Sequence, residues 1–456
     1  MMLSKFLLVA LLFCIGTLGS DHPSAAEFNL FCRILKETDE MLLVPDYIYD
    51  EDKDKEVVKE MQFLYNATTD NMKNFGNTMW KMKDFLKEHP PPTQPRNRQD
   101  SHNQIGQLIQ DGEKKIIESW GLAKKVNEKI YEAKLLVLQG IYGENVTVVP
   151  KEDGNLTDII SKNGSIFNDE TNVTASCGNG KKTGKTLIND FFCVCVGTGI
   201  HESGSPCHGN LIPPNKDRDC CKNKKCCNDG CKCCKNGCCA NNKCCGTNNC
   251  CCCGCNWTQM KYGTSSSLLA LTESFEKIKA VCQDLLDDED DTKKIIVLLK
   301  EYLGMIGKGG AKQKQNKTYM FGQSAWGAED SHEKVNFSDC TGGGNNGDKA
   351  NGNWKNNNHM CVDYKNNFKN ESNTYDIPWH NKFKNYTILL NDAKQIEDKI
   401  LKNRAALHLL KTKAWAAYTR EKDDETSNLD DMNISNLLDG TQLPPFFFLS
   451  HLSIFL

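Results

Sequence analysis

Residues 220–255 read CCKNKKCCNDGCKCCKNGCCANNKCCGTNNCCCCGC and hold 16 of the 25 cysteines of this 456-residue chain. Thiolates at such CC, CxC and CxxC spacings can bridge several soft metal ions, but in an oxidising compartment they pair as disulfides instead. The segment has almost no apolar residues, so only cross-links could order it. We therefore favour a disulfide-stapled, basic surface loop over a metal cluster. With six lysines against one aspartate, this loop could also bind anions or acidic surfaces.

Eight further cysteines lie outside this run and outside the first 20 residues: Cys32, Cys177, Cys193, Cys195, Cys207, Cys282, Cys340 and Cys361. Because eight is an even number, they could form four disulfides without using the run, but the sequence leaves their pairing open. Two of them belong to FFCVCVGTG at 191–199. The alternating apolar character of this segment predicts a short buried strand that carries two bridges.

The remaining motifs predict no catalysis, no metal site and no cofactor. GNGKKTGKT at 178–186 departs from the spacing of a phosphate-binding P-loop, and no apolar strand precedes it. We interpret it as an exposed basic loop. His201 and His208 flank Cys207 without a clear further ligand, so we interpret them as loop residues. The sequence contains no Ser/His/Asp or Cys/His arrangement, and we predict that the protein is not an enzyme.

The first 20 residues, MMLSKFLLVALLFCIGTLGS, have one lysine before a short apolar run and then small residues. This is the layout of a secretory signal peptide, because the apolar run is too short for a membrane-spanning helix. Cleavage after Gly19 or Ser20 would remove Cys14 and leave 24 cysteines, an even number. Export to an oxidising compartment therefore supports the disulfide interpretation of the cysteine run.

The C-terminal end predicts a glycosylphosphatidylinositol (GPI) anchor. A polar segment with small residues precedes a short apolar tail at 446–456, and the candidate attachment residues are Ser435, Asn436 and Asp439. Eleven Asn-x-Ser/Thr sequons predict N-linked glycans on the surface of an exported chain. Their asparagines are Asn66, Asn145, Asn155, Asn163, Asn172, Asn256, Asn316, Asn336, Asn370, Asn385 and Asn433. The formal net charge of −3 gives no global basic field, so we predict no nucleic-acid partner.

Long apolar seams predict the helices. From Ile105 to Gly140 the apolar or small residues are spaced alternately by four and three, which predicts a helix over about 101–142 with one face against a partner. A similar seam covers 57–86, and the proline-rich HPPPTQPRNRQDS lies between the two. We therefore predict an antiparallel hairpin of two long helices. A third seam at 389–417 could add a helix, with Asn403 as a buried polar residue that sets the register.

Shorter apolar patterns at 268–285 and 295–303 predict two further helices. Together the patterns predict a mainly α fold, an elongated antiparallel helical hairpin or coiled-coil bundle with a long irregular, cysteine-rich insertion forming the distal head. The expected domains are a signal peptide at 1–20, a helical domain at 21–425 with its insertion at 143–264, and a linker with the anchor signal at 426–456.

The motifs Cys193-Val-Cys195 and Ser205-Pro206-Cys207, together with the signal peptide, hairpin and tail, resemble a known family. They are similar to the variant surface glycoproteins (VSGs) of African trypanosomes, with the closest fit to the b-type N-terminal domains typical of the congolense lineage. The resemblance covers about 24–420. Two features depart from the family pattern: the cysteine run, and the lack of a separate cysteine-rich domain after the last helix.

The resemblance implies a non-catalytic, homodimeric coat glycoprotein held on the outer leaflet of the plasma membrane by GPI. It also implies that antigenically distinct versions are exchanged, so that host antibodies lose recognition. One alternative is a surface receptor for a host protein on the same helical scaffold. Another is a metal-binding surface protein that acts through residues 220–255.

Overall fold

The computed structural model describes residues 22, 24–69, 83–150, 165–168, 173–178, 183–196, 205–213, 257–286, 293–308, 319–326, 340 and 358–420. The chain divides into two compact units. We call Met1–Val44 with Tyr131–Ile388 the cysteine unit, and Pro45–Ile130 with Leu389–Leu456 the helical unit.

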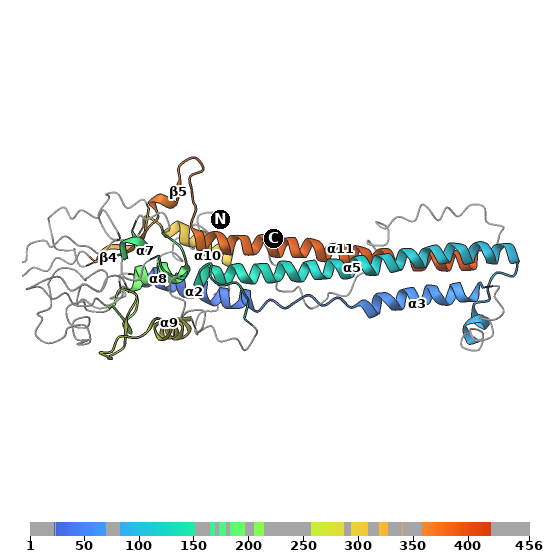
Figure 1. Ribbon diagram of the computed structural model, residues 1–456, viewed down its shortest axis with the longest axis horizontal. Helices are drawn as coiled ribbons and strands as arrows, with labels where there is room; N and C mark the ends of the chain where they lie inside the picture. Colours follow the sequence, from blue (N-terminus) through green and yellow to red (C-terminus); the bar gives the residue numbers. More distant parts are fainter. Residues whose placement is uncertain are drawn as a thin grey trace, which may run out of the picture. The chain divides into compact units, whose positions relative to one another are not determined.

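Most of the described elements are helices (Figure 1). The helices are α2 (Ala25–Leu42), α3 (Glu51–Ala67), α5 (Pro95–Tyr142), α7 (Val173–Cys177), α8 (Leu187–Cys195), α9 (Leu271–Leu286), α10 (Ile295–Met305), η4 (Lys365–Asn367) and α11 (Pro378–Thr419). The strands are β1 (Leu211–Ile212), β2 (Lys261–Tyr262), β3 (Met320–Trp326), β4 (Asn358–Asp363), β5 (Phe368–Lys369) and β6 (Thr374–Tyr375). They pair as three antiparallel two-stranded sheets, β1–β2, β3–β4 and β5–β6.

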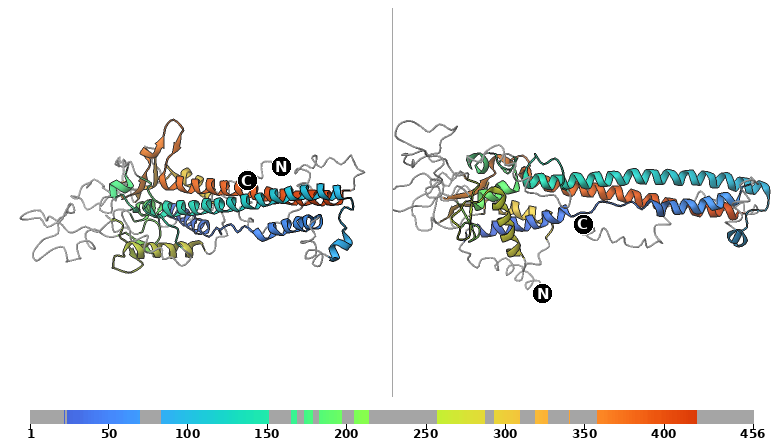
Figure 2. Two further views of the ribbon diagram at one scale, coloured as in Figure 1. Left: turned by 45° about the vertical axis from the view of Figure 1, so that its right-hand side comes forward. Right: turned by 60° about the horizontal axis from the view of Figure 1, so that its bottom comes forward.

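The helical unit is held by a seam between three helices. Val57 of α3, Ile116 of α5 and Leu407 of α11 form one buried cluster. A second buried cluster contains Met61, Leu64, Ala67, Ile105, Ile109, Ala414, Ala417 and Tyr418. Residue numbers therefore rise along α3 and α11 while they fall along α5, which makes α5 antiparallel to both. Figure 2 shows the three helices side by side in this unit. The predicted mainly α fold with an antiparallel helical hairpin is confirmed.

Small residues in the seam let the helices approach closely, as the sequence predicted. A Cβ atom added at Gly112 of α5 would lie 3.1 Å from Met61 Cε and 3.4 Å from Leu407 Cδ1. Asn403 is buried, and its Nδ2 donates to Ser119 Oγ at 3.3 Å. The third helix and its polar seam residue are therefore present, and the hydroxyl of the facing seam position accepts the hydrogen bond.

Charged contacts line the edge of α11 that faces α3. Arg404 Nε donates to Asp54 Oδ1 at 2.6 Å, with both side chains largely buried. Further along, Glu60 accepts from Lys411 Nζ at 3.2 Å and from Trp415 Nε1 at 2.8 Å. The Arg404–Asp54 pair fixes which faces of α11 and α3 meet, because removal of one partner would leave the other buried and unpaired.

The first helix of the hairpin is shorter than its seam suggested. α3 ends at Ala67 rather than near 86, because Thr68 caps it: the Thr68 hydroxyl donates to the carbonyls of Leu64 and Tyr65. Residues 83–88 are again helical, while 70–82 lie outside the described residues. α5 begins at Pro95, six residues earlier than predicted, since proline suits the first turn of a helix, where its missing N–H is not needed.

The cysteine unit packs shorter elements around a core of aromatic rings. α2 contacts α8, α9 and α10, and α8 contacts both strands of the β3–β4 sheet. Phe31 of α2 makes edge contacts with Phe191, Tyr302 and Phe321, with ring centroids 5.4, 5.9 and 5.6 Å away. Offset and edge contacts of this kind stabilise aromatic pairs beyond the area that they bury.

Two local predictions for this unit need correction. Residues 191–195 lie in a helix, not a strand, because Thr186 caps α8 by accepting from Asn189 N–H and all nine residues of α8 are buried. A short segment that is buried on every side gives no periodicity by which helix and strand could be told apart. In α9 the seam ends on buried Leu286, whereas Leu285 is exposed.

Candidate functional site

The eight cysteines outside both the run and the first 20 residues are all paired in the structure. The bridges are Cys32–Cys282, Cys177–Cys193, Cys195–Cys207 and Cys340–Cys361. Cys32–Cys282 joins α2 to α9 across 250 residues of sequence, whereas the other three close loops of 12 to 21 residues. Every cysteine of the chain lies within the residue ranges of the cysteine unit, and the helical unit has none.

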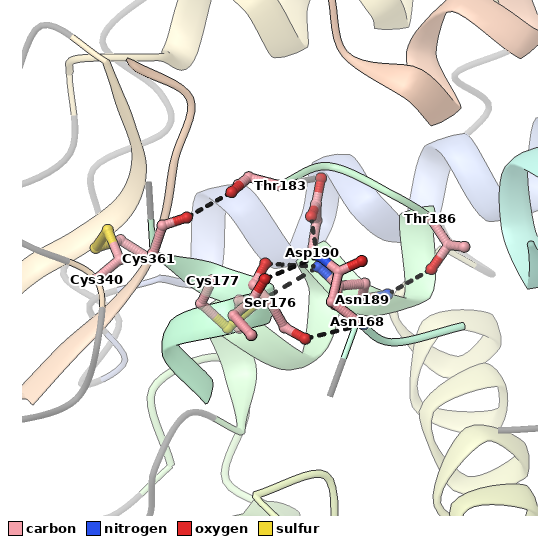
Figure 3. Close-up of a disulfide and its surroundings, with 12 residues drawn as sticks. Asn168, Ser176, Cys177, Thr183, Thr186, Asn189, Asp190, Cys340 and Cys361 are labelled. Carbon is pink, nitrogen blue, oxygen red and sulfur yellow. Dashed lines mark hydrogen bonds between the residues drawn. A yellow bond between two sulfur atoms is a disulfide. The ribbon is translucent and has the colours of Figure 1, made fainter. Parts of the chain in front are cut away.

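Helix α8 is the centre of this arrangement. Two of its residues, Cys193 and Cys195, bridge to Cys177 of α7 and to Cys207 before β1. Between the cap and these cysteines lie two polar residues, Asn189 and Asp190, which are both fully buried. Figure 3 shows them beside Ser176 and the Cys177 disulfide.

The carboxylate of Asp190 gathers donors from three segments. Oδ2 accepts from the Tyr364 hydroxyl and from Trp379 Nε1, the latter at 2.6 Å. Oδ1 accepts from the side-chain amide of Asn189 at 3.0 Å. The Asn189 amide also donates to the Ser176 carbonyl at 3.2 Å, which ties α8 to α7. One buried carboxylate therefore connects α8, the residue that follows β4, and the first turn of α11.

A second tyrosine extends the network. The hydroxyls of Tyr302 and Tyr364 lie 2.6 Å apart, and both residues are fully buried. Burial raises the pKa of Asp190 to about 6, against the opposing effect of its three donors. Burial also raises the pKa values of Tyr302 and Tyr364 well above their ordinary value, so both hydroxyls stay protonated.

The carboxylate, the two phenol hydroxyls and the indole N–H of this centre are buried and hydrogen-bonded to one another. Their evident role is to link segments of the cysteine unit. Cys207 is oxidised in its bridge to Cys195, which removes it as a thiolate ligand beside His208. Within the part of the chain that the structure describes, no three His, Cys, Asp or Glu side chains are grouped as metal ligands.

The interpretation of GNGKKTGKT as an exposed loop is wrong for its described residues, 178 and 183–186. Thr183 and Thr186 are fully buried, and Lys185 Nζ donates to the Phe167 carbonyl at 2.9 Å. Gly184 has a φ of 75°, and a Cβ atom there would lie 2.8 Å from Ile377 Cγ2. The segment therefore turns tightly into α8 because glycine permits both the positive φ and the close approach.

Several predicted sites lie outside the described residues: the signal peptide, the cysteine run, His201, the three candidate anchor residues and seven sequons. The other four sequons, at Asn66, Asn145, Asn370 and Asn385, are described. Sequence reasoning missed Asp190. The signal that could have found it is a single acidic residue within the apolar segment LINDFFCVC, since a carboxyl group in such surroundings needs hydrogen-bond partners.

The long helices and the disulfide-linked centre around α8 define the class of protein: a disulfide-linked protein that contains a bundle of long helices. Residues 45–218 match the family model VSG_B, described as the trypanosomal VSG domain, and a search of the curated proteins finds no match. The matched residues include α3, α5, α7 and α8. This match supports a VSG b-type N-terminal domain in the chain. Such a domain implies a variant surface coat protein, and the family is one of structural rather than enzymatic proteins.

Proposed function

We propose that this chain is a GPI-anchored surface glycoprotein that forms a coat, shields the plasma membrane and takes part in antigenic variation. The observation that carries the proposal is the VSG domain match over 45–218. Among the described residues, no helix is both long enough and apolar enough to cross a bilayer. The proposed attachment of the lipid is at Ser435, Asn436 or Asp439.

The packing of the helical unit supports a role in antigenic variation. Its stability rests on a narrow seam, while residues between the seam positions, such as Gln107, Gln110 and Glu113 of α5, are exposed. Substitution at exposed helix positions away from caps and pairs usually changes the free energy of unfolding by less than about 0.5 kcal/mol. The surface can therefore change while the fold is retained.

The anchor can be tested directly on cells that display the protein. A phosphatidylinositol-specific phospholipase should release the chain into the medium, whereas a spanning segment would leave it on the cells. Retention after complete cleavage of a known GPI-anchored control protein would contradict the proposal. We also propose a homodimer, which light scattering of the released protein would detect as twice the mass of the chain.

The receptor alternative predicts a different abundance. A coat requires a dense layer and hence a high copy number at the surface, whereas a receptor can act at a few hundred copies. Quantitative surface labelling distinguishes the two. For the metal-binding alternative, mass spectrometry of the intact protein would show either bound metal or the loss of two hydrogens for each cysteine pair in 220–255.

A further inference from the structure

The structure separates the four described sequons into two kinds. The asparagines of three are exposed: Asn145 after α5, Asn370 between β5 and β6, and Asn385 on α11. Asn66, in the last turn of α3, is half-buried. An N-linked glycan is a bulky group that requires open surface around its asparagine.

Asn66 is built into the end of its helix. Its Oδ1 accepts from Gln62 Nε2 at 3.2 Å, and the next residue, Ala67, lies in the buried seam. The third residue of the sequon, Thr68, is buried and caps α3. A glycan on Asn66 would have to fit beside these contacts, so chains modified there would pack poorly.

Asn145 and Asn385 share a second feature, which is an exposed apolar side chain close by. Val148 follows Asn145 by three residues and is 63% exposed. Ile388 follows Asn385 by three residues and is 49% exposed. Residues three apart on a helix lie on the same face, so Asn385 and Ile388 are neighbours on the surface of α11.

The two sequons also lie near one another in the cysteine unit. Lys382 Nζ, three residues before Asn385, is 3.6 Å from Glu144 Oε1, and Glu144 precedes Asn145. Lys382 Nζ also donates to Gln139 Oε1 at 3.2 Å. These contacts bring the end of α5 and the first turns of α11 together, so the two asparagines lie in the same part of the cysteine unit.

We propose that N-linked glycans on Asn145 and Asn385 cover Val148 and Ile388, that Asn370 also carries a glycan, and that Asn66 carries none. The inference rests on the proposed function only in requiring export through a glycosylating compartment. Covered apolar side chains cannot associate with other molecules, which matters for a protein that is crowded on a surface.

Glycopeptide mapping tests which asparagines carry glycans. The protein is taken from a eukaryotic cell that secretes or displays it. Enzymatic release of glycans in heavy-oxygen water converts each modified asparagine to labelled aspartate. Label is expected at 145, 370 and 385 and not at 66. Label at 66, or its absence at 145, 370 or 385 in a chain labelled elsewhere, would overturn the inference. A chain without label at any of the eleven sequons would instead contradict export, and thus the proposed function.

Removal of glycans from the folded protein tests whether they cover Val148 and Ile388. This experiment avoids the risk that a variant fails to fold. An endoglycosidase should cause a severalfold rise in the fluorescence of a dye that binds exposed apolar surface, together with association beyond the proposed dimer. Unchanged dye binding after complete removal would overturn the covering role.

A matched variant identifies the surface responsible. In V148S/I388Q the sequons remain, but the apolar side chains beneath the glycans are gone. Enzymatic removal of its glycans should then leave both dye binding and oligomeric state as they were before treatment. An equal rise in this variant and in the parent protein would show that the glycans cover some other surface, which contradicts the proposal.

Discussion

The helical unit and the cysteine unit are stabilised by different interactions. The helical unit has no cysteine, and its described residues are held by a repeated apolar seam between three helices. The described residues of the cysteine unit form shorter elements, four disulfides and a buried carboxylate that accepts from three donors. Long helices satisfy their own backbone hydrogen bonds and need only one buried stripe, whereas short elements bury less per residue and gain from cross-links.

This comparison predicts that the two units can be destabilised separately. Hydrogen exchange is the suitable measurement throughout, because it reports the free energy of opening of each segment rather than one value for the whole chain.

The largest effect is expected from loss of the Cys32–Cys282 bridge. It closes a loop of 250 residues, for which the chain-entropy account gives about 5 kcal/mol, against about 3 kcal/mol for a loop the size of that between Cys177 and Cys193. In C32A/C282A, amides of α2 and α9 should lose most of their protection, while those of α3 should keep theirs. Equal losses in α2 and α3 would show that the units do not open independently.

A cavity in the helical seam should produce the reverse pattern. Met61 is fully buried between α5 and α11, so Met61→Ala is expected to cost about 3 kcal/mol through lost burial and the cavity that remains. Protection should fall in α3 and not in α8. Phe63→Ala is the matched control, because Phe63 is 50% exposed and its removal should cost under about 1 kcal/mol. A comparable loss in both variants would contradict the seam.

An effect of up to about 3 kcal/mol is expected from the raised pKa of Asp190. Its pKa in the folded protein is about 6, above the ordinary value of 3.8. Stabilisation by proton uptake is therefore fully present below pH 3.8 and is lost as the pH rises through 6. Protection of α8 should fall over this range in the parent protein but not in Asp190→Asn, which cannot titrate.

Glu397 provides a counterpart of this titration in the helical unit. It is buried on α11, and burial raises its pKa to about 7. Glu397→Gln should therefore remove a pH dependence of α11 protection between pH 4.5 and 7, with the same sign, and leave α8 unaffected. If either variant altered the pH dependence of the other unit, the separation of the two would be wrong.

The smallest effect is expected at the polar pair in the seam. Replacing Asn403 and Ser119 together, as N403L/S119A, removes both members of a buried hydrogen bond, so stability should change by under about 1 kcal/mol. The register of α11 against α5 should instead become less specific, because a purely apolar seam allows one helix to shift along the other. Cysteine cross-linking between pairs placed along α5 and α11 would detect the alternative registers, and a single register would contradict the role of Asn403.

The sequence alone determined the helical unit almost completely. The alternation of four and three residues from Ile105 to Gly140 identifies the buried face of α5 because a helix has one fixed period. The same logic located α11 and its polar residue Asn403. The apolar spacing did not predict where α3 ends. The spacing continues past Thr68, but the helix ends at Ala67, and the Thr68 hydroxyl donates to carbonyls of its last turn.

Only the tertiary structure decided the cysteine unit. Which cysteines pair, that 191–195 form a helix, and that Asp190 holds three segments together all depend on contacts between residues distant in the chain. The pairing of cysteines leaves no period in the sequence, and neither does α8, because this helix is short and all nine of its residues are buried. The two units differ in how well the sequence predicts them for a physical reason. An apolar seam repeats along a single helix and is visible in its sequence, whereas a cross-linked core depends on contacts between segments that are distant in the chain.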